Sequence, residues 1–323
     1  MKDVASAAGV ALKTVSRVVN GEPGVHPATA ERVRTAIDRL GYSRNESARV
    51  LRRGRTATIG LVIEDVSDPF YSGLSRAVEG VVIEHGCLLL SGSSGEEPGR
   101  ERELVETFCA RRVDGLIVVP AGDDHTYLRP ELEAGTPVVF ADRPPGPGIN
   151  VDTVLTDNAG GARQAVRHLM THGHRRIAFL GDDPAIFTAA ERLRGYRAEL
   201  GGLFDGRLVS MRPPETGAIR TDLTRMFALD DPPTALFTGN GRYTVATLRA
   251  LAGQRVALVG FDDFELADLL DPGVSVVAQD PSWMGRMAAE LLFRRLRGDA
   301  GPPQHLELPV RLVTRGSGEL PPG

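Results

Sequence analysis

The chain has 323 residues, about twice the length of a typical single domain, which predicts two or three compact units. It is 41% hydrophobic, 25% charged and 5% aromatic, a composition that excludes a disordered, collagen-like or purely coiled-coil protein. No apolar run approaches the roughly 20 residues that span a bilayer, and the N-terminus has no secretory leader. Cys87 and Cys109 have neither metal-ligand nor disulfide-framework spacing. We therefore expect a soluble cytoplasmic protein without a metal or cofactor.

Charge is distributed unevenly along the chain. Residues 1–55 contain 11 Lys+Arg and 5 Asp+Glu, a local balance of +6, whereas the remainder contains 27 and 37, a balance of −10. This asymmetry suggests that the short basic segment binds a polyanion such as nucleic acid. Chance clustering of charge explains the same numbers equally well, so the choice between them depends on the motifs.

Three short helices are predicted in the first 43 residues. The first ends at Gly9, a residue suited to a left-handed turn, the second begins at about Leu12, and the third runs from about Pro27 to Leu40. Their apolar positions at helical spacing are Val4, Ala5 and Ala8, then Val15, Val18 and Val19, then Ala30, Val33, Ile37 and Leu40. Two short helices with a third packed behind them indicate a helix-turn-helix unit, in which the second helix enters the major groove of DNA.

The order of motifs in this segment is more specific than its apolar spacing, which any three-helix bundle shares. Asp3-Val4-Ala5, Ala8-Gly9-Val10 and residues 14–21 resemble the lactose-repressor (LacI/GalR-type) family of bacterial transcription regulators, and the resemblance extends over nearly the whole chain. It implies that Leu12 and Lys13 set operator preference. It also implies contacts to bases or phosphates from Thr14, Ser16, Arg17 and Asn20. An arginine that pairs with guanine through two hydrogen bonds contributes about 1–3 kcal/mol of discrimination.

Residues 42–56 are basic and weakly apolar, a composition that fits a solvated linker with some helical tendency. The resemblance instead implies a hinge helix that orders on operator DNA. Leu51 would then open a central base step from the minor groove, Ala48 would let two paired hinge helices approach closely, and Asn45 would contact the backbone.

The segment departs from the family pattern at two residues. Ala11 stands where a capping Ser or Thr is usual, a loss of about 0.5–2 kcal/mol, and Arg44 stands where Pro is usual. The family also has several more residues before the first helix, so the sequence leaves open whether Met1 is the true start.

From Thr58 onwards, strand-like runs alternate with helical stretches. The runs are Ile59–Ile63, Cys87–Leu90, Gly115–Val119, Val138–Ala141, Ile177–Leu180, Ala235–Thr238 and Val256–Phe261. The helical stretches include Gly73–Glu84, Arg100–Ala110, Ala159–Thr171, Ala189–Leu200 and Thr244–Leu251. This alternation predicts parallel sheets built from βαβ units. Two such series, broken near Thr156-Asp157, predict two lobes with a cleft at the carboxyl ends of their strands.

The resemblance implies the architecture of periplasmic sugar-binding proteins, with further crossings between lobes near Gln279-Asp280 and Leu306–Pro309. The expected fold is therefore an all-α helix-turn-helix domain followed by two doubly wound α/β lobes. The expected bounds are 1–43 for the DNA-binding domain, 44–56 for the hinge and 57–323 for the effector-binding and dimerisation domain, whose N-lobe spans 57–157 and 280–306 and whose C-lobe spans 158–279 and 307–323. The C-terminal residues 320–323 contain no leucine-heptad tail, which in this family provides tetramers, so a homodimer is expected.

Several residues after the predicted strands are candidates for effector contacts, each with a plainer alternative. Phe70 and Tyr71 fit a hydrophobic staple at a helix start, and Asp142 before Arg143-Pro144-Pro145 fits a turn former. A lone Arg such as Arg192 is usually a solvated charge. The resemblance implies that these four residues contact the effector, as do Asp262 and, less completely, Asn240. Asp263 is expected to be structural.

Three other segments are interpreted as structural. The loops Arg143–Gly148 and Ala252–Arg255 differ from common family members and are expected to be surface variation. His172-Gly173-His174 resembles a pair of metal ligands, but a turn fits better because the family has a comparable Gly-His segment without a metal. Gly241 stands where the family normally has Asp, which weakens any transfer of effector identity.

No catalytic motif is present: the chain lacks a nucleophile elbow, a phosphate-binding Gly-rich loop and a zinc-spaced histidine cluster. The expected function is that of a repressor that binds pseudopalindromic operator DNA and whose affinity is controlled by a small effector, a sugar or sugar derivative. The alternative is a solute-binding receptor or sugar-processing enzyme with the same two-lobed fold and an unrelated basic N-terminus.

Overall fold

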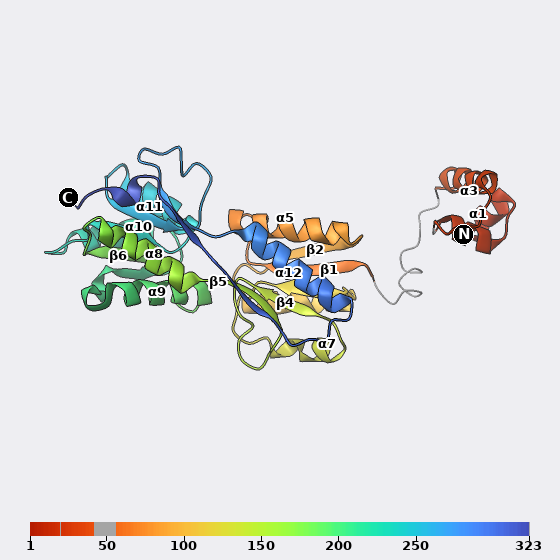
Figure 1. Cartoon of the computed structure of the whole chain (residues 1–323), viewed down its shortest axis with the longest axis horizontal. Coiled ribbons are helices and arrows are strands. Elements are labelled where there is room, and N and C mark those ends of the chain that lie inside the picture. Colours follow the sequence, from red (N-terminus) through yellow and green to blue (C-terminus); the bar gives the residue numbers. More distant parts are fainter. Residues whose placement is uncertain (20, 42–55, 323) are drawn as a thin grey trace. The chain divides into compact units, whose positions relative to one another are not determined.

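A computed structural model describes residues 1–19, 21–41 and 56–322 of the chain (Figure 1). The chain divides into two compact units, Met1–Thr56 and Ala57–Gly323, and each is described here by itself. No helix among the described residues is both long enough and apolar enough to cross a membrane.

The first unit contains the three expected helices, which are α1 (Lys2–Ala8), α2 (Leu12–Val19) and α3 (Pro27–Arg39). Val4, Val15 and Val33, one from each helix, are fully buried and form the centre of the small core. Gly9 ends α1 with a φ of 63°, the left-handed conformation that glycine adopts without steric cost. The predicted helix-turn-helix arrangement is therefore confirmed.

The second unit contains two six-stranded sheets. The first has the order β11-β5-β4-β3-β1-β2 and the second has the order β12-β10-β9-β8-β6-β7. The strands of the first sheet are β1 (Thr58–Ile63), β2 (Leu88–Ser93), β3 (Gly115–Val118), β4 (Val138–Ala141), β5 (Asp152–Thr156) and β11 (His305–Leu308). Those of the second are β6 (Ile177–Gly181), β7 (Val209–Met211), β8 (Ala235–Thr238), β9 (Ala257–Phe261), β10 (Ser275–Ala278) and β12 (Arg311–Val313).

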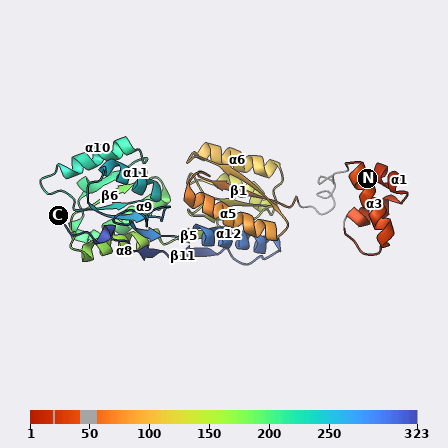
Figure 2. The ribbon, with the colours of Figure 1, turned by 90° about the horizontal axis from the view of Figure 1, so that it is seen from above.

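Helices cover both faces of each sheet, as expected for a doubly wound fold. Figure 2 shows α6 on one side of the first sheet and α5 and α12 on the other. In the second sheet α10 and α11 pack on one face and α8 and α9 on the other. The helices are α5 (Pro69–Glu84), α6 (Pro98–Ala110), α7 (Arg129–Glu133), α8 (Asn158–Thr171), α9 (Phe187–Leu200), α10 (Thr216–Phe227), α11 (Gly241–Leu251) and α12 (Pro281–Leu296). Short 3-10 turns are η1 (Thr126–Leu128), η2 (Gly201–Leu203), η3 (Gly206–Leu208) and η4 (Ser317–Glu319).

The chain passes between the two sheets at three places. It leaves the first sheet after β5 and enters α8, it returns from β10 into α12, and it passes from β11 into β12. α12 packs closely against α5, where a Cβ on Gly285 would lie 2.4 Å from the Leu74 carbonyl oxygen. This close approach holds α12 on the first sheet, although it follows the second sheet in sequence.

One strand departs from the expected all-parallel sheets. β12 pairs with β10 in the antiparallel direction, whereas the other strand pairs are parallel. Only Pro309 and Val310 separate β11 from β12, so the chain crosses directly from the end of β11 into the second sheet. It enters that sheet at the edge where the parallel strands end, and β12 therefore runs against them. An antiparallel edge strand on an otherwise parallel sheet is common in α/β folds.

Candidate effector cleft and DNA-facing helix

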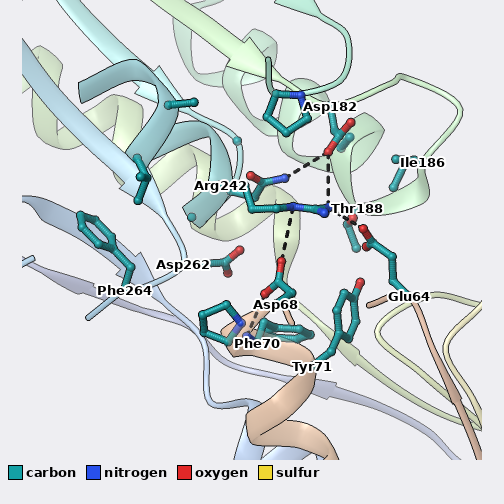
Figure 3. Close-up of a pocket in the computed structure, with 18 of the residues that line it drawn as sticks. Glu64, Asp68, Phe70, Tyr71, Asp182, Ile186, Thr188, Arg242, Asp262 and Phe264 are labelled. Carbon is teal, nitrogen blue, oxygen red and sulfur yellow. Dashed lines mark hydrogen bonds and ion pairs between the residues drawn. The ribbon is translucent and has the colours of Figure 1, made fainter. Parts of the chain in front are cut away.

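A cavity of about 380 Å³ lies between the two lobes of the second unit (Figure 3). It is lined by residues that directly follow β1, β4, β6, β8 and β9, which is where open parallel sheets hold their ligands. The six candidates from the sequence all line it, and these are Phe70, Tyr71, Asp142, Arg192, Asn240 and Asp262. The structure thus brings together residues that are up to 192 positions apart in the chain (from 70 to 262).

The two lobes supply carboxylates from equivalent places in their sheets. Asp142 follows β4 and Asp262 follows β9, and both have a φ of 68°. Each donates its backbone N–H to the neighbouring strand at 2.9 Å. A positive φ is uncommon outside glycine, but Asp tolerates it better than most residues. Glu64 after β1 and Asp182 after β6 form a second such pair, so four carboxylates face the cavity from matching strand ends.

Arg143 is buried beneath the cavity, with only 5% of its surface exposed. Its Nη1 donates to Glu96 Oε2 at 2.8 Å and to the Pro120 carbonyl oxygen at 2.9 Å. Its Nη2 donates to Glu64 Oε2 at 3.3 Å and to the Tyr71 hydroxyl at 3.2 Å. The expectation that the loop starting at Arg143 is surface variation is therefore wrong for this residue, because its guanidinium neutralises two carboxylates inside the lobe.

Arg192 is fixed against the second sheet. Its Nε donates to Asn158 Oδ1 at 2.7 Å and its Nη1 donates to the Gly239 carbonyl oxygen at 2.6 Å. The guanidinium lies over the Phe261 ring at 3.8 Å from its centroid, and Nη1 is 3.6 Å from Asp262 Oδ2. Because it is only 4% exposed, Arg192 is not the solvated charge of the plainer interpretation.

Arg242 joins the two lobes electrostatically. It is the second residue of α11, and its Nη2 lies 2.5 Å from Glu64 Oε1 and 3.9 Å from Asp182 Oδ2. Its Nε lies 3.4 Å from Asp68 Oδ2. Glu64 and Asp68 adjoin strand β1 of the first sheet, whereas Arg242 belongs to the second lobe, so these ion pairs cross the cavity (Figure 3).

The remaining candidates, Asn240, Tyr71 and Phe70, line the cavity and also contact neighbouring residues of the protein. Asn240 caps α11 by accepting the Tyr243 N–H at 2.9 Å, and its Nδ2 donates to Asp182 at 3.3 Å. The Tyr71 hydroxyl donates to Asp142 Oδ2 at 3.2 Å. The Phe70 ring lies edge-on to Tyr71 with centroids 5.1 Å apart.

Burial changes the ionisation of the acidic groups. Desolvation raises the pKa of Asp68, Asp142 and Asp182 above the usual range, and the cations nearby offset only part of it. The same cause raises the pKa of Glu96 to about 7, despite its hydrogen bond to Arg143. The cavity wall therefore holds negative charge at a free-energy cost, and further negative charge there would increase that cost.

The polar groups of the lining that sequence reasoning missed include Glu64, Asp182, Arg242 and Gln279. The position of Glu64 and Asp182 directly after buried strand runs was an available signal. Arg242 and Gln279 had none, because their partners lie far away in sequence: Arg242 contacts Glu64 across 178 positions.

In the first unit, α2 presents the residues that sequence analysis predicted to meet DNA. Leu12, Lys13 and Arg17 are exposed, and Thr14 and Ser16 are half-buried, whereas Val15 faces the core. Arg17 Nε lies 4.0 Å from Glu22 Oε2 in an exposed pair, which costs little to open. Asn20, Asn45, Ala48 and Leu51 lie outside the described residues, and their roles stay predictions.

The segment His172–His174 is a turn that closes α8. Gly173 has a φ of 97°, and His174 is buried between the Thr234 hydroxyl and the Leu320 carbonyl oxygen, 2.8 Å from each. Within the described part of the chain, no group of three or more His, Cys, Asp or Glu side chains is arranged to hold a metal ion.

A helix-turn-helix unit joined to a two-lobed ligand-binding unit defines a class of proteins, the ligand-responsive DNA-binding regulators. Comparison with protein families agrees: residues 1–45 match the model of bacterial regulatory proteins of the lacI family, and residues 166–318 match a periplasmic binding protein-like domain.

Individual relatives cover almost the whole chain. The HTH-type transcriptional regulator CelR of Thermobifida fusca is 37% identical over 98% of this chain and 97% of its own length. Among solved structures, the CelR–cellobiose complex (33% identity, TM-score 0.72) and the Lac repressor bound to ONPG (26% identity, TM-score 0.84) each match 98% of both chains. This chain belongs to the lacI family of bacterial regulatory proteins. It is a DNA-binding transcriptional regulator and not an enzyme.

The ion pairs of Arg242 lead to a test of lobe coupling. Replacing Arg242→Met should let the lobes separate and should lower the free energy of unfolding by about 1–3 kcal/mol, since three carboxylates lose a partner that solvent already screens in part. Small-angle X-ray scattering of the effector-free protein should show a larger radius of gyration. Arg249→Met, an exposed position on the same helix, is the control. Equal radii for all three proteins would exclude a role for Arg242 in holding the lobes together.

The raised pKa of Glu96 predicts a pH dependence of stability. Its carboxylate is favoured in the unfolded chain, so folding is penalised fully above pH 7. The penalty falls between pH 7 and 4.5 and is lost below 4.5, where Glu96 is protonated in both states. Glu96→Gln should therefore raise the Tm at pH 8 by a few degrees, and the gain over wild type should shrink as pH is lowered to 5. Glu97→Gln, an exposed neighbour, should show neither effect. A variant less stable than wild type at pH 8 would mean that the Arg143 pair outweighs burial.

Proposed function

We propose that this chain is a cytoplasmic repressor that binds a pseudopalindromic operator as a homodimer. A carbohydrate effector that enters the interlobe cavity raises or lowers its affinity for the operator. The observation that carries the proposal is the presence, in one chain, of an exposed α2 surface with two cations and a polar cavity at the strand ends of a two-lobed unit. Effector binding between lobes changes their separation and so is coupled reciprocally to DNA affinity.

The DNA-binding part of the proposal rests on α2. Lys13 and Arg17 are exposed on this helix, so they are free to meet phosphates and base edges, while Val15 holds the opposite face in the core. Leu12 is 46% exposed at the start of the helix, so its side chain is available for an apolar contact in the major groove. We assign operator preference to Leu12 and Lys13, and supporting contacts to Thr14, Ser16 and Arg17.

The effector part of the proposal rests on the cavity and on relatives. CelR has been solved as a complex with cellobiose and the Lac repressor with ONPG, which supports a sugar or glycoside as the effector class here. We propose that Asp142 and Asp262 accept ligand hydroxyl protons and that Arg192, with Asn240, donates hydrogen bonds. Phe70 and Tyr71 would cover the apolar face of a sugar ring.

The domain bounds are part of the same proposal. We assign 1–43 to DNA binding and 44–56 to a hinge. The N-lobe takes 57–157 and 280–306, and the C-lobe takes 158–279 and 307–323. The sheet order supports this division apart from residues 307–308, since β11 (His305–Leu308) lies wholly in the first sheet and β12 joins the second.

The homodimer needs a surface on the second unit. Both lobes have large exposed apolar side chains. These are Val66, Ile83 and Leu88 from β1 to β2, and Leu266, Leu269 and Leu270 between β9 and β10. Exposed apolar groups in such number favour association, and β2 is an edge strand. We propose these residues as the dimer interface.

Operator binding provides one test of the function. A duplex selected from random sequence by the intact protein should bind Lys13→Gln and Arg17→Gln at least about tenfold more weakly, since each loses a charge-assisted contact. Fluorescence anisotropy at several salt concentrations should also show a smaller salt slope for both variants. Arg34→Gln, an exposed change on α3, is the control. Failure of the wild type to select any sequence would contradict the repressor function.

Effector binding provides the second test. Asp262→Asn keeps a side chain that tolerates the positive φ but removes the charge, and should weaken the effector about 10–100-fold because a charged hydrogen bond contributes about 1.5–3 kcal/mol. Titration calorimetry measures this loss, and operator affinity without effector should be unchanged. Asp183→Asn, exposed and outside the cavity, should bind effector like wild type. Equal effector affinity in Asp262→Asn and wild type would remove Asp262 from the site.

A further inference from the structure

Carboxylates outnumber guanidinium groups in the lining of the cavity. The carboxylates are Glu64, Asp68, Asp142, Asp182, Asp262 and Asp263, and the guanidinium groups are Arg143, Arg192, Arg242 and Arg249. Asp263 and Arg249 are exposed, and leaving this pair out gives five carboxylates against three guanidinium groups. In both counts the cavity wall carries two more negative than positive groups.

The three inner arginines are engaged with the protein itself. Arg143 contacts Glu64 and Glu96, and Arg242 contacts Glu64, Asp68 and Asp182. Arg192 is held by Asn158, Gly239 and the Phe261 ring, with Asp262 3.6 Å away. A carboxylate or phosphate on a ligand would compete with these protein carboxylates for Arg143 and Arg242, and taking either arginine would leave a protein carboxylate unpaired in a poorly solvated place.

The cavity offers acceptors for hydroxyl groups instead. An ionised carboxylate accepts several hydrogen bonds, and Asp142 and Asp262 receive only part of that number from the protein. Gln279 donates to Asp262 at 2.5 Å, and its Oε1 is buried without a hydrogen-bond partner. Such acceptors suit a ligand that brings O–H donors and no charge.

Apolar surface is present beside these acceptors. Phe70 from the first lobe, and Phe264 and Ile186 from the second, line the same cavity (Figure 3). Aromatic and aliphatic side chains with a few fixed polar groups are the usual composition of a small-molecule site. They fit the C–H face of a sugar ring, while the carboxylates fit its hydroxyl edge.

We propose that the effector of this regulator is an uncharged polyhydroxylated ring, a neutral sugar or glycoside, and that the cavity excludes sugar acids and sugar phosphates. This inference rests on the proposed carbohydrate-effector function and narrows it by charge. The surplus of carboxylates provides the selection, because a ligand anion meets repulsion that a neutral ligand of the same shape does not.

The test uses the full-length protein and matched sets of probes. Each set contains a neutral sugar, its aldonic acid and its phosphate: glucose, gluconate and glucose 6-phosphate; ribose, ribonate and ribose 5-phosphate; cellobiose, cellobionate and cellobiose 6′-phosphate. Thermal shift finds the set that binds, and titration calorimetry with operator binding measures it. We expect the neutral member to bind at least about tenfold more tightly than either anion and to change operator affinity.

Two charge variants test the cause of this selectivity. Asp182→Asn and Asp68→Asn, one from each lobe, should reduce the preference for the neutral member severalfold, because each removes one negative charge from the cavity. Asn at position 68 also keeps the capping bond to the Phe70 N–H. Asp183→Asn makes the same change of charge outside the cavity and should leave the preference unchanged.

The outcomes distinguish a failure of the charge inference from a failure of the carbohydrate-effector function. Tighter binding of the acid or phosphate would overturn the charge inference and leave the carbohydrate-effector function in place. Binding of the neutral member with a preference that neither Asp182→Asn nor Asp68→Asn alters would overturn the carboxylates as its cause. No thermal shift and no change in operator affinity with any probe would contradict the carbohydrate-effector function, and the charge inference with it.

Discussion

Glu64 is the buried charge on which the arrangement of the cleft depends. It is 5% exposed and lies between two guanidinium groups, Arg143 of its own lobe at 3.3 Å and Arg242 of the other lobe at 2.5 Å. An unpaired carboxylate at this depth would be strongly destabilising, so the fold must supply cations from both sides. Because one of the two comes from the opposite lobe, the neutralisation of Glu64 is complete only when the lobes are close together. A change in the distance between the lobes therefore changes the electrostatic energy of the cavity.

That link gives a physical basis for control by a small molecule. A ligand shifts an equilibrium between lobe arrangements only by the difference in its affinity for them. Here a ligand that binds near Glu64, Asp68 and Asp182 contacts the carboxylates that already form ion pairs with Arg242. It can replace or reinforce those ion pairs, and either result changes the free energy of the close arrangement. Inducer and corepressor behaviour can thus arise from one cavity by a change in which contacts the ligand makes.

The sequence predicts the parts of this arrangement that are encoded locally. Alternating strand runs and helices predicted the two lobes, and Asp142 and Asp262 were found because each follows a strand and also matches a family position. β7 and β12, of three residues each, and β11, an edge strand with exposed residues, have too little apolar pattern to be detected. Arg143 and Arg242 could not be placed, because what gives them a role is a carboxylate 79 or 178 positions away. The local sequence pattern predicts where a strand ends. It does not predict which charged side chains lie together at that end, because they come from distant parts of the sequence.

The glycine at position 241 keeps one further carboxylate out of this group of charges. Family members normally carry Asp at this place, and an acidic residue in the first turn of a helix is favourable by about 0.3–1 kcal/mol. In this chain a Cβ at Gly241 would lie 3.7 Å from the Asp262 Cβ, so an aspartate would place a further carboxylate beside Asp262 and next to Arg242. Two carboxylates on neighbouring side chains repel each other, which opposes the gain at the helix terminus. Asn240 caps α11 without adding a charge, so the helix still begins at Gly241. The number of carboxylates that the three inner arginines must neutralise therefore does not increase.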